Sequence, residues 1–317
     1  MSKYKIKPHL PEDLKTYSLY SRESKVNINT FAKVLAPEKT FIRFIDSLPD
    51  ILAGGDYKTF ISLMGKAKKR NKAILFALGA HVIKVGLSPL IIDLLKHGWI
   101  TALALNGAGI VHDFEIALTG QTSEDVELQI KNGQFGMARE TGEMLNDAIN
   151  LGVKEGFGLG EAVGKMIAES DFPHKDMSLL SAAYSLNIPV TVHVAIGTDI
   201  IHFHPRVKGE ALGEASLKDF FLFCSLLERL EGGGVFINVG SAVILPEVFL
   251  KAVSFLRNKG RSIEEFSTAV FDFIHHYRPY QNVAKRPLGK KGKGFYFIGH
   301  HEIMIPLLAA TLKSINA

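Results

Sequence analysis

The sequence predicts an α/β fold of the Rossmann-like class, with a doubly wound, mostly parallel sheet and helices on both faces. Three observations lead to this prediction. Short apolar runs alternate with longer amphipathic stretches along most of the chain. The apolar runs are hydrophobic throughout, which is typical of strands that are covered on both faces. Several of these runs end in a glycine turn that opens a helix, as strands of open α/β sheets do at their carboxyl ends.

The composition fits a globular protein and excludes several other classes. The chain has 317 residues, of which 47% are hydrophobic and 22% charged, so a packed core is expected. The net charge of +5 is a small excess that does not by itself indicate nucleic-acid binding. A single cysteine, Cys224, excludes an internal disulfide. We see neither a run of roughly 20 apolar residues nor a signal peptide, so we expect a cytoplasmic protein that does not bind membranes.

The organisation along the chain predicts a cap followed by one folded unit. Residues 1–60 are mostly helical in pattern and are expected to form an N-terminal cap or extension. Residues 61–317 are expected to form the nucleotide-binding α/β domain. Its first strand is predicted at 72–79, KAILFALG, because this run is apolar and ends at a glycine.

The next elements alternate as the fold class requires. A helix is predicted at 88–98, where Ser88 is the N-cap, Pro89 the first helical position and Gly98 the C-cap. The apolar run 99–105 predicts the second strand. Further strands are predicted at 188–195, 234–240, 268–274 and 294–299. Further helices are predicted near 123–149, 159–170, 177–185, 215–230, 246–258 and 300–315.

Three glycine turns at predicted strand ends are candidates for a nucleotide site. They are Gly79-Ala80-His81, Asn106-Gly107-Ala108-Gly109 and Gly240-Ser241-Ala242. Small residues allow backbone N–H groups to approach a phosphate or ribose, and a helix start favours negative charge. One such turn alone is more simply a tight turn, but three in one sheet favour a site. The glycine-rich segment 156–164 follows a helix rather than a strand, so we interpret it as a helix start.

Histidines and acids are dense between residues 193 and 205, HVAIGTDIIHFHP. His202 and His204 are two positions apart on a run predicted to be extended, so they are expected to share one face. A metal site needs three or four converging ligands, and no tight ligand motif is present, so no metal is predicted. Without a metal, these histidines are expected either to line the mouth of a pocket or to be hydrogen-bonded in the core.

Two basic runs have simple structural interpretations. The segment 284–294, AKRPLGKKGKG, is expected to be a solvated, mobile loop, although a lysine in a closed pocket can be a nucleophile that forms an imine. The run 66–72, KAKKRNK, is expected to be a helix end whose charges suit the helix dipole. No nucleic-acid partner is predicted, because aromatic residues do not interleave with the basic ones.

Several strings in this order resemble deoxyhypusine synthase. GAHVIKVGL and the following IIDLLKHGWITALALNGAGIVHD are similar to the first nucleotide-binding segment of that family. Three later segments are also similar: NIPVTVHVAIGTDIIHFHP, GGVFINVGSAVILPEVFLKA and KGFYFIGHHEIMIPLLAATL. The resemblance runs from about residue 24 to the C-terminus, and its order and spacing are more specific than any one string.

The resemblance implies a Rossmann-like fold, a homotetramer and NAD bound between subunits. It implies that spermidine is oxidised by hydride transfer to NAD and that the aminobutyl group moves to an active-site lysine as an imine. A lysine of an acceptor protein then receives the group. The residues that match cofactor-binding positions are Ala80, His81, Asn106, Gly107, Ala108, Gly240 and Ser241. Asp199 matches an acid that holds a polyamine amine, and Lys285 matches the imine-forming lysine.

Three functions remain open from the sequence. The first is the NAD-dependent aminoalkyl transfer that the resemblance implies, with His202 or His204 as the proton shuttle. The loop before Lys285, HHYRPYQNVAK, lacks the acids that grip the polyamine in that family. The second function is therefore a divergent enzyme on the same scaffold, with another substrate and His/Asp-assisted or metal-dependent chemistry. The third is a nucleotide-binding protein without catalysis.

Overall fold

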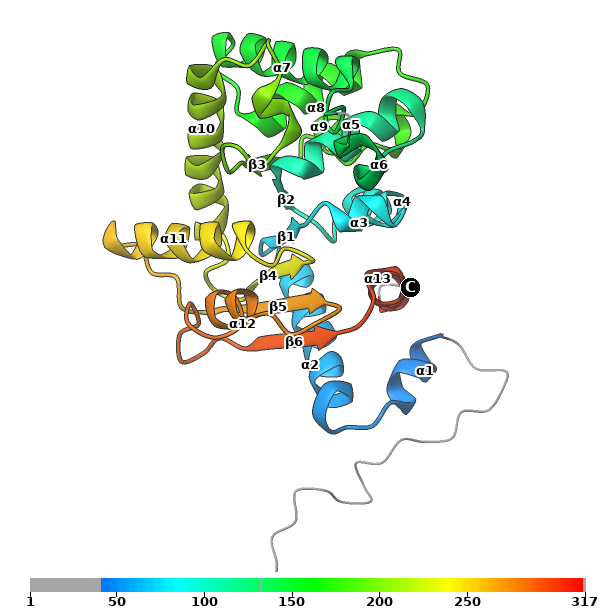
Figure 1. Ribbon diagram of the computed structural model, residues 1–317. Coiled ribbons are helices and arrows are strands. Elements are labelled where there is room, and N and C mark those ends of the chain that lie inside the picture. Colours follow the sequence, from blue (N-terminus) through cyan, green and yellow to red (C-terminus); the bar gives the residue numbers. More distant parts are fainter. Residues whose placement is uncertain (1–40, 132, 316–317) are drawn as a thin grey trace, which may run out of the picture.

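The computed structural model describes residues 41–131 and 133–315, and its centre is one parallel sheet of six strands (Figure 1). The strands run in the order β3-β2-β1-β4-β5-β6. Their bounds are β1 (Ile74–Leu78), β2 (Ala102–Asn106), β3 (Val190–His193), β4 (Gly234–Val239), β5 (Phe266–Asp272) and β6 (Gly294–Ile298). This is the strand order of the Rossmann fold, and it confirms the predicted fold class.

Helices cover both faces of the sheet. They are α1 (Phe41–Ser47), α2 (Leu52–Lys69), α3 (His81–Lys84), α4 (Ser88–Lys96), α5 (Gly107–Thr119), α6 (Val126–Ile130), α7 (Arg139–Lys154), α8 (Leu159–Glu169), α9 (Leu179–Ser185), α10 (Gly209–Glu228), α11 (Ile244–Asn258), α12 (Tyr277–Asn282) and α13 (His301–Ser314). Two 3-10 turns, η4 (Lys175–Met177) and η5 (Ile200–Phe203), lie between them.

The alternation of side chains along the central strand explains the two layers. Ile74, Phe76 and Leu78 of β1 belong to the core shared with α2, α4 and α13. Leu75 and Ala77 point to the opposite face and belong to the core shared with α10 and α11. Every residue of β1 is buried. Apolar runs without alternation are therefore what a strand covered on both faces needs.

All six predicted strands are present, and the main helical error lies between residues 123 and 149. One helix is predicted there, but α6 and α7 are separate. Gly133 and Gly136 lie between them with φ of +67° and +76°. This left-handed backbone ends a helix. The short helices α3 and α12 were not predicted, and α10 begins at Gly209 rather than near 215.

The predicted N-terminal cap lies largely outside the described residues, which begin at 41. Its described part contains α1 and the first half of α2. How the chain divides into folding units stays a prediction. Within the described part of the chain, no helix has the length and apolar character needed to cross a membrane.

Candidate functional site

The three predicted glycine turns lie at the carboxyl ends of adjacent strands β2, β1 and β4. The order reverses at β1, because β2 lies on one side of it and β4 on the other. The turns of β1 and β4 are in close contact: a Cβ on Gly79 would lie 2.2 Å from the Gly240 carbonyl oxygen. In open α/β sheets, ligands bind at such a switch point. The structure therefore places the three turns side by side at this switch point.

The carboxylate of Asp199 lies against the second turn, at the start of α5. A Cβ on Gly107 would be 2.0 Å from Asp199 Oδ2, so only glycine leaves room for the acid. The Ala108 backbone N–H donates to the carboxylate. Burial raises the pKa of Asp199 to about 6, although the bonds from Ala108 and Thr198 act in the opposite direction. The start of a helix favours an anion, and here the carboxylate of Asp199 itself occupies that position.

His202 lies beside Asp199 in a defined tautomer. Its side chain is 3% exposed, and its Nδ1 accepts the backbone N–H of Gly197 at 3.1 Å. Because Nδ1 is an acceptor, the hydrogen of the neutral ring is on Nε2. Nε2 lies 3.7 Å from Asp199 Oδ2, which is too long for a hydrogen bond. Both atoms are buried and have no hydrogen-bond partner among the described residues.

The prediction that His202 and His204 share one face is wrong. Residues 200–203 form the 3-10 turn η5 rather than an extended run, and Asp199 is its N-cap. The turn directs His202 towards Asp199, whereas the ring of His204 packs on Gly142 of α7. A Cβ on Gly142 would be 2.2 Å from His204 Cδ2.

A cavity of about 200 Å³ lies next to Asp199 and Ala108. Its lining comes from α3, α5, the segment that leads into and out of α6, and the residues before η5. The lining residues are Lys84, Ala108, Val111, His112, Glu115, Ser123, Glu124, Val126, Phe135, Thr198, Asp199 and Ile200. The cavity thus joins the second predicted turn to the predicted substrate-binding acid.

A hydrogen-bonded chain fixes His112 in the wall of this cavity. His112 Nδ1 lies 2.6 Å from Thr122 Oγ1, and the Thr122 hydroxyl donates to Glu115 Oε2 at 2.5 Å. Because the single hydroxyl hydrogen of Thr122 goes to Glu115, its oxygen accepts from His112 Nδ1. The lone pair of the neutral ring is therefore on Nε2. Burial, with a smaller effect of the Lys84 charge, lowers the pKa of His112 to about 4.

His112 and Glu115 are not among the residues predicted from the sequence. Ala108, His112 and Glu115 are spaced by four and three residues, so they lie on one face of a helix that starts at a predicted turn. That spacing was the available signal. The contact with Asp199, which is far away in sequence, required the fold.

A second group of buried polar side chains lies at the carboxyl ends of β4 and β5. Asp272 is 2% exposed, and its Oδ2 lacks a hydrogen-bond partner among the described residues. His301, at the start of α13, packs on the third turn, since a Cβ on Gly240 would be 2.6 Å from its Cε1. The His301 ring centroid is 5.6 Å from that of His81. His301 Nδ1 is also buried without a partner.

The unpartnered atoms provide a test of whether the site suits a dinucleotide. Asp199 Oδ2, His202 Nε2, Asp272 Oδ2 and His301 Nδ1 are all buried near strand tips. Buried polar groups normally have partners. A ligand rich in hydroxyl and amide groups, lying along this edge, would satisfy them. In this respect the residues fit. Because the Asp199 carboxylate occupies the start of α5, phosphates of such a ligand would have to lie at the turns of β1 and β4 instead.

Lys285 lies elsewhere. It is exposed, follows α12, and its Nζ is 5.8 Å from the Tyr280 ring centroid. The Val283 carbonyl accepts from Thr268 Oγ1, and the Ala284 carbonyl packs on Gly294 at the start of β6. β6 is four strands away from β2, roughly 19 Å at the usual spacing. The structure therefore does not bring Lys285 and Asp199 together within one chain.

The segment 156–164 has the structural role that the sequence predicts. Gly158 is the N-cap of α8, and Asp219 of α10 accepts the backbone N–H of Gly160 at 3.0 Å and of Val192 at 2.8 Å. A Cβ on Gly160 would lie 2.0 Å from the Val190 carbonyl oxygen. These glycines allow α8 to approach β3, and a protein carboxylate already occupies the helix start.

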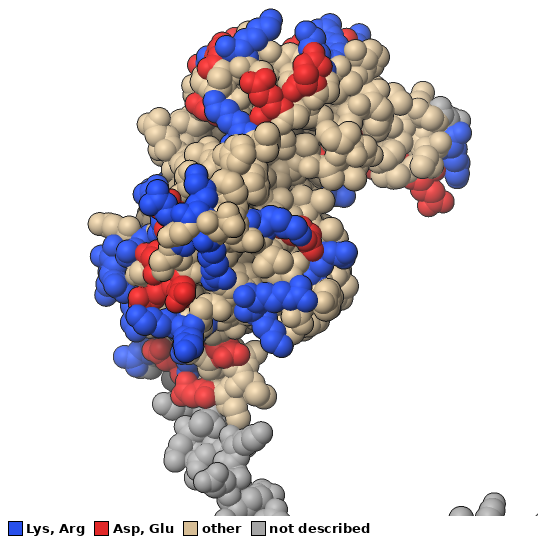
Figure 2. All heavy atoms as spheres, turned by 90° about the vertical axis from the view of Figure 1, so that its left-hand side faces the viewer, with Lys and Arg blue, Asp and Glu red and all other residues tan. Residues whose placement is uncertain are grey.

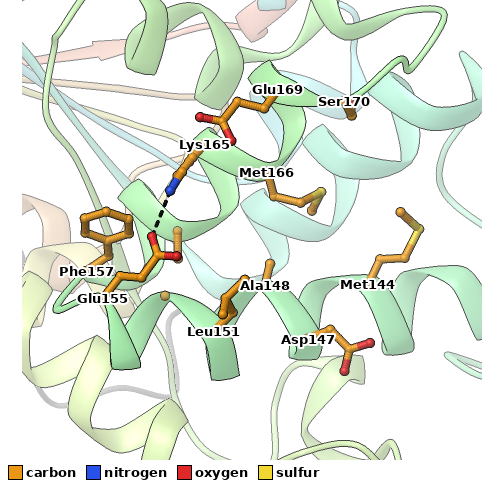
Figure 3. Close-up of a pocket in the computed structure, with 12 residues that line it drawn as sticks. Met144, Asp147, Ala148, Leu151, Glu155, Phe157, Lys165, Met166, Glu169 and Ser170 are labelled. Carbon is orange, nitrogen blue, oxygen red and sulfur yellow. Dashed lines mark hydrogen bonds and ion pairs between the residues drawn. The ribbon is translucent and has the colours of Figure 1, made fainter.

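A larger cavity lies between α7 and α8 (Figure 3). It measures about 600 Å³ and has Met144, Leu151 and Met166 in its lining. Two of its charged groups pair with each other: Lys165 donates to Glu155 at 2.8 Å, the contact dashed in Figure 3. None of the predicted site residues lines it. Among the described residues, no group of three or more His, Cys, Asp or Glu side chains could hold a metal ion.

Comparison with known proteins gives similarity in structure but not in sequence. No family model and no curated protein matches the sequence. The complex of AgrE with ornithine and NAD+ is similar with a TM-score of 0.52 and 12% identity over 89% of this chain. A "conserved putative LOR/SDH protein" from Methanococcus maripaludis S2 is similar with a TM-score of 0.51 and 15% identity, covering 89% of this chain and 72% of its own.

This chain spans about a third of AgrE, 34%, and of ArgZ, an arginine dihydrolase from cyanobacteria, 33%. A "putative deoxyhypusine synthase" from Entamoeba histolytica gives a TM-score of 0.46 at 10% identity, with 88% of this chain and 94% of its own covered. Identities this low show the Rossmann-like fold and do not assign the chain to a family.

Proposed function

We propose that this chain is an NAD-dependent enzyme that oxidises a small amine or alcohol in the cavity beside the carboxyl end of β2. One observation carries the proposal: His112, Asp199 and Ala108 line the same cavity, next to the turn of β2 and beside the switch point. A cavity of about 200 Å³ holds about seven water molecules at roughly 30 Å³ each. This volume suits a small substrate or the reacting end of a longer one.

In this proposal the chain's own residues move the proton and hold the substrate. NAD, when bound, takes up the hydride. The lone pair on His112 Nε2 accepts the proton of the substrate's amine or hydroxyl group, since Nδ1 is fixed by Thr122. The carboxylate of Asp199 is ionised above about pH 6 and holds an ammonium group of the substrate. Ala80, His81, Gly240 and Ser241 are the residues that we assign to the cofactor, with Asn106, Gly107 and Ala108 forming the adjacent turn.

Two observations support the cofactor. Buried polar atoms without partners lie near the strand tips, where a dinucleotide would supply donors and acceptors. The AgrE structure described with NAD+ has the same type of fold. A direct test replaces Ala80 by Glu, which puts a carboxylate where the phosphates are expected. We expect NAD to stabilise the unmodified protein by about 2.7 kcal/mol at a hundredfold excess over its Kd, and not the variant.

The catalytic test compares two half-buried histidines. His112→Gln should lower kcat by about 10²- to 10⁴-fold while NAD binding persists, as expected for the loss of a general base. His204→Gln is the matched control, because His204 faces Gly142 of α7 rather than the cavity. Equal activity of the two variants would exclude His112 as the base. Stabilisation by NAD without turnover of any amine or alcohol would instead support a non-catalytic binding protein.

Aminoalkyl transfer through an imine on Lys285 is the finer form of this proposal, and the resemblance to deoxyhypusine synthase supports it. Since Lys285 and Asp199 are separated within one chain, the transfer needs Lys285 from a second subunit of a homo-oligomer, such as the tetramer implied by the resemblance. Borohydride with NAD and spermidine should then trap an adduct on Lys285. Lys285→Ala should abolish the adduct and Lys290→Ala should not. An adduct that persists in Lys285→Ala would refute this role, and no adduct in any variant would leave direct oxidation.

A further inference from the structure

The edge of the sheet opposite the candidate site carries a broad basic surface. Four segments meet at the amino ends of the strands: 69–72 before β1, 228–233 before β4, 257–265 before β5 and 285–293 before β6. We call these segments the amino-edge basic surface. Figure 2 faces this edge and shows Lys and Arg side chains gathered over the lower half of the molecule.

Contacts between neighbouring segments make this surface continuous. Lys72 Nζ donates to the Glu231 carbonyl at 3.0 Å, which joins the first segment to the second. The Glu231 carboxylate accepts the backbone N–H groups of Glu264 and Glu265 at 2.6 and 3.1 Å. Arg257 donates to the Pro287 carbonyl at 2.6 Å, which attaches the last segment. The basic runs, far apart in sequence, are therefore held side by side.

The charge of this surface is strongly unbalanced. The four segments contain twelve Lys or Arg residues and four Glu residues, which gives them a net charge of +8. The net charge of the whole chain is only +5. Two of the acids form long ion pairs within the surface, Glu228 with Arg261 at 3.4 Å and Glu265 with Lys291 at 3.7 Å. The helix dipole accounts for basic residues at the ends of α2 and α11. It does not account for Lys290, Lys291 and Lys293, which lie in a loop before a strand.

We propose that the amino-edge basic surface binds the phosphate backbone of a double-helical nucleic acid without reading its sequence. The amino ends of β1, β4, β5 and β6 are adjacent and span roughly 14 Å at about 4.8 Å per strand. That span is comparable with the roughly 12 Å width of a major groove, so phosphates on both strands of a duplex are within reach. Backbone contacts of this kind position a protein but carry no sequence information.

The lack of apolar groups on this surface favours a nucleic acid over an acidic protein. None of the large exposed hydrophobic side chains of the described residues lies in the four segments. Protein–protein interfaces have an apolar, often aromatic, core. Single-strand binding depends on stacking aromatic rings, and these are missing from the exposed part of the surface as well. Of the three partners considered, an acidic protein, a single strand and a duplex, the duplex fits this surface best, through contact with its phosphates. The sequence predicts no nucleic acid because aromatic residues do not interleave with the basic ones, but contact with the phosphates of a duplex does not need such residues.

The test uses the full chain and a labelled duplex of about 20 base pairs, as RNA and as DNA, in fluorescence anisotropy over salt concentrations from about 50 to about 200 mM. The variant is Lys290→Ala, Lys291→Ala and Lys293→Ala together. The matched control is Lys131→Ala, Lys154→Ala and Lys208→Ala, which removes three exposed lysines outside the surface. We expect the first triple variant to raise Kd at least about tenfold and to reduce the slope of log K against log salt by about 2 to 3. The control should stay within about twofold of the unmodified protein.

Three outcomes would overturn the proposal. The first is no binding of either duplex by the unmodified protein at the lowest salt concentration. The second is an equal loss of binding in the two triple variants, which would mean that overall charge and not this surface binds the duplex. The third is binding of poly-glutamate with an affinity equal to that for the duplexes, which would indicate an acidic protein as the partner. Circular dichroism of each variant shows that the fold is intact.

Discussion

Replacing Asp199 by Asn tests the buried carboxylate at the start of α5. The amide keeps an oxygen that can accept the Ala108 N–H, and its NH2 group takes the position of the unpartnered Oδ2. The native acid has a pKa of about 6 against an ordinary value of 3.8. Ionising it in the folded protein therefore costs about 3 kcal/mol at about 1.4 kcal/mol per pH unit. We expect Asp199→Asn to be more stable than the unmodified protein above about pH 7 by up to this amount.

The pH dependence gives the sign of the effect. Between about pH 4 and pH 6 the folded protein holds a proton on Asp199 that the unfolded chain has lost, so stability from this group falls as the pH rises. Asp199→Asn has no carboxyl group at this position, so its stability should not fall in this way as the pH rises. Urea unfolding at about pH 4 and about pH 8 measures both values, and in thermal unfolding the difference at the higher pH corresponds to roughly 5 °C.

The control is Asp171→Asn, at an exposed position. It should change the free energy of unfolding by less than about 0.5 kcal/mol at either pH. A difference between Asp199→Asn and the unmodified protein that is the same at both pH values would refute the reasoning. So would a variant less stable at the higher pH. Under the proposed function, activity should fall in Asp199→Asn although the protein becomes more stable, because an ammonium group of the substrate would lose its counter-charge.

The remaining predictions concern two glycine and acid contacts and one histidine. Gly107→Ala places a Cβ 2.0 Å from Asp199 Oδ2, so it should displace the carboxylate and abolish activity with little change in secondary structure, checked by turnover and circular dichroism. Asp219→Ala leaves the Gly160 and Val192 N–H groups without their acceptor and should cost about 3 kcal/mol in urea unfolding, whereas Asp219→Asn, which keeps an oxygen, should cost less. Burial lowers the pKa of His193 to about 4, so its contribution is present above about pH 6.5 and is lost as the pH falls towards 4. His193→Gln should flatten the acid limb of the stability curve, and an unchanged limb would contradict this.

The sequence predicted the sheet well because its strands follow a simple rule. Every strand except β6 is buried almost throughout, and runs such as ILFAL of β1 are apolar without alternation, as is typical of strands covered on both faces. The break between α6 and α7 was missed because glycines are tolerated in helices, and only the backbone angles show that Gly133 and Gly136 end them. Residues 200–203 were predicted as extended because η5 is a single short turn capped by Asp199, and a turn of this length has no periodic pattern in the sequence.

The site was predictable only in part, since it depends on contacts between distant segments. The turns at Gly79, Asn106 and Gly240 could be found because each follows a strand directly. The pairing of Asp199 with α5 could not, because the acid and the helix are joined only by the fold. The chain from His112 through Thr122 to Glu115 is local in sequence, but the helical spacing of His112 and Glu115 does not show the bond through Thr122. Lys285 was matched only by its position along the sequence, and this position does not show on which edge of the sheet the lysine lies.

The helix α6 packs weakly beside the cavity, and we expect this to affect how the cavity is reached. None of the side chains of Val126–Ile130 is buried, although the flanking segments, with Ser123, Glu124 and Phe135, supply part of the cavity wall. Segments that bury so little open locally at a small fraction of the free energy of global unfolding. Amides of α6 should therefore exchange with solvent long before those of β1, and we expect a small molecule to enter and leave through this side while the sheet stays folded. The expected entrance and the rigid frame of the cavity would then be separate parts of one chain.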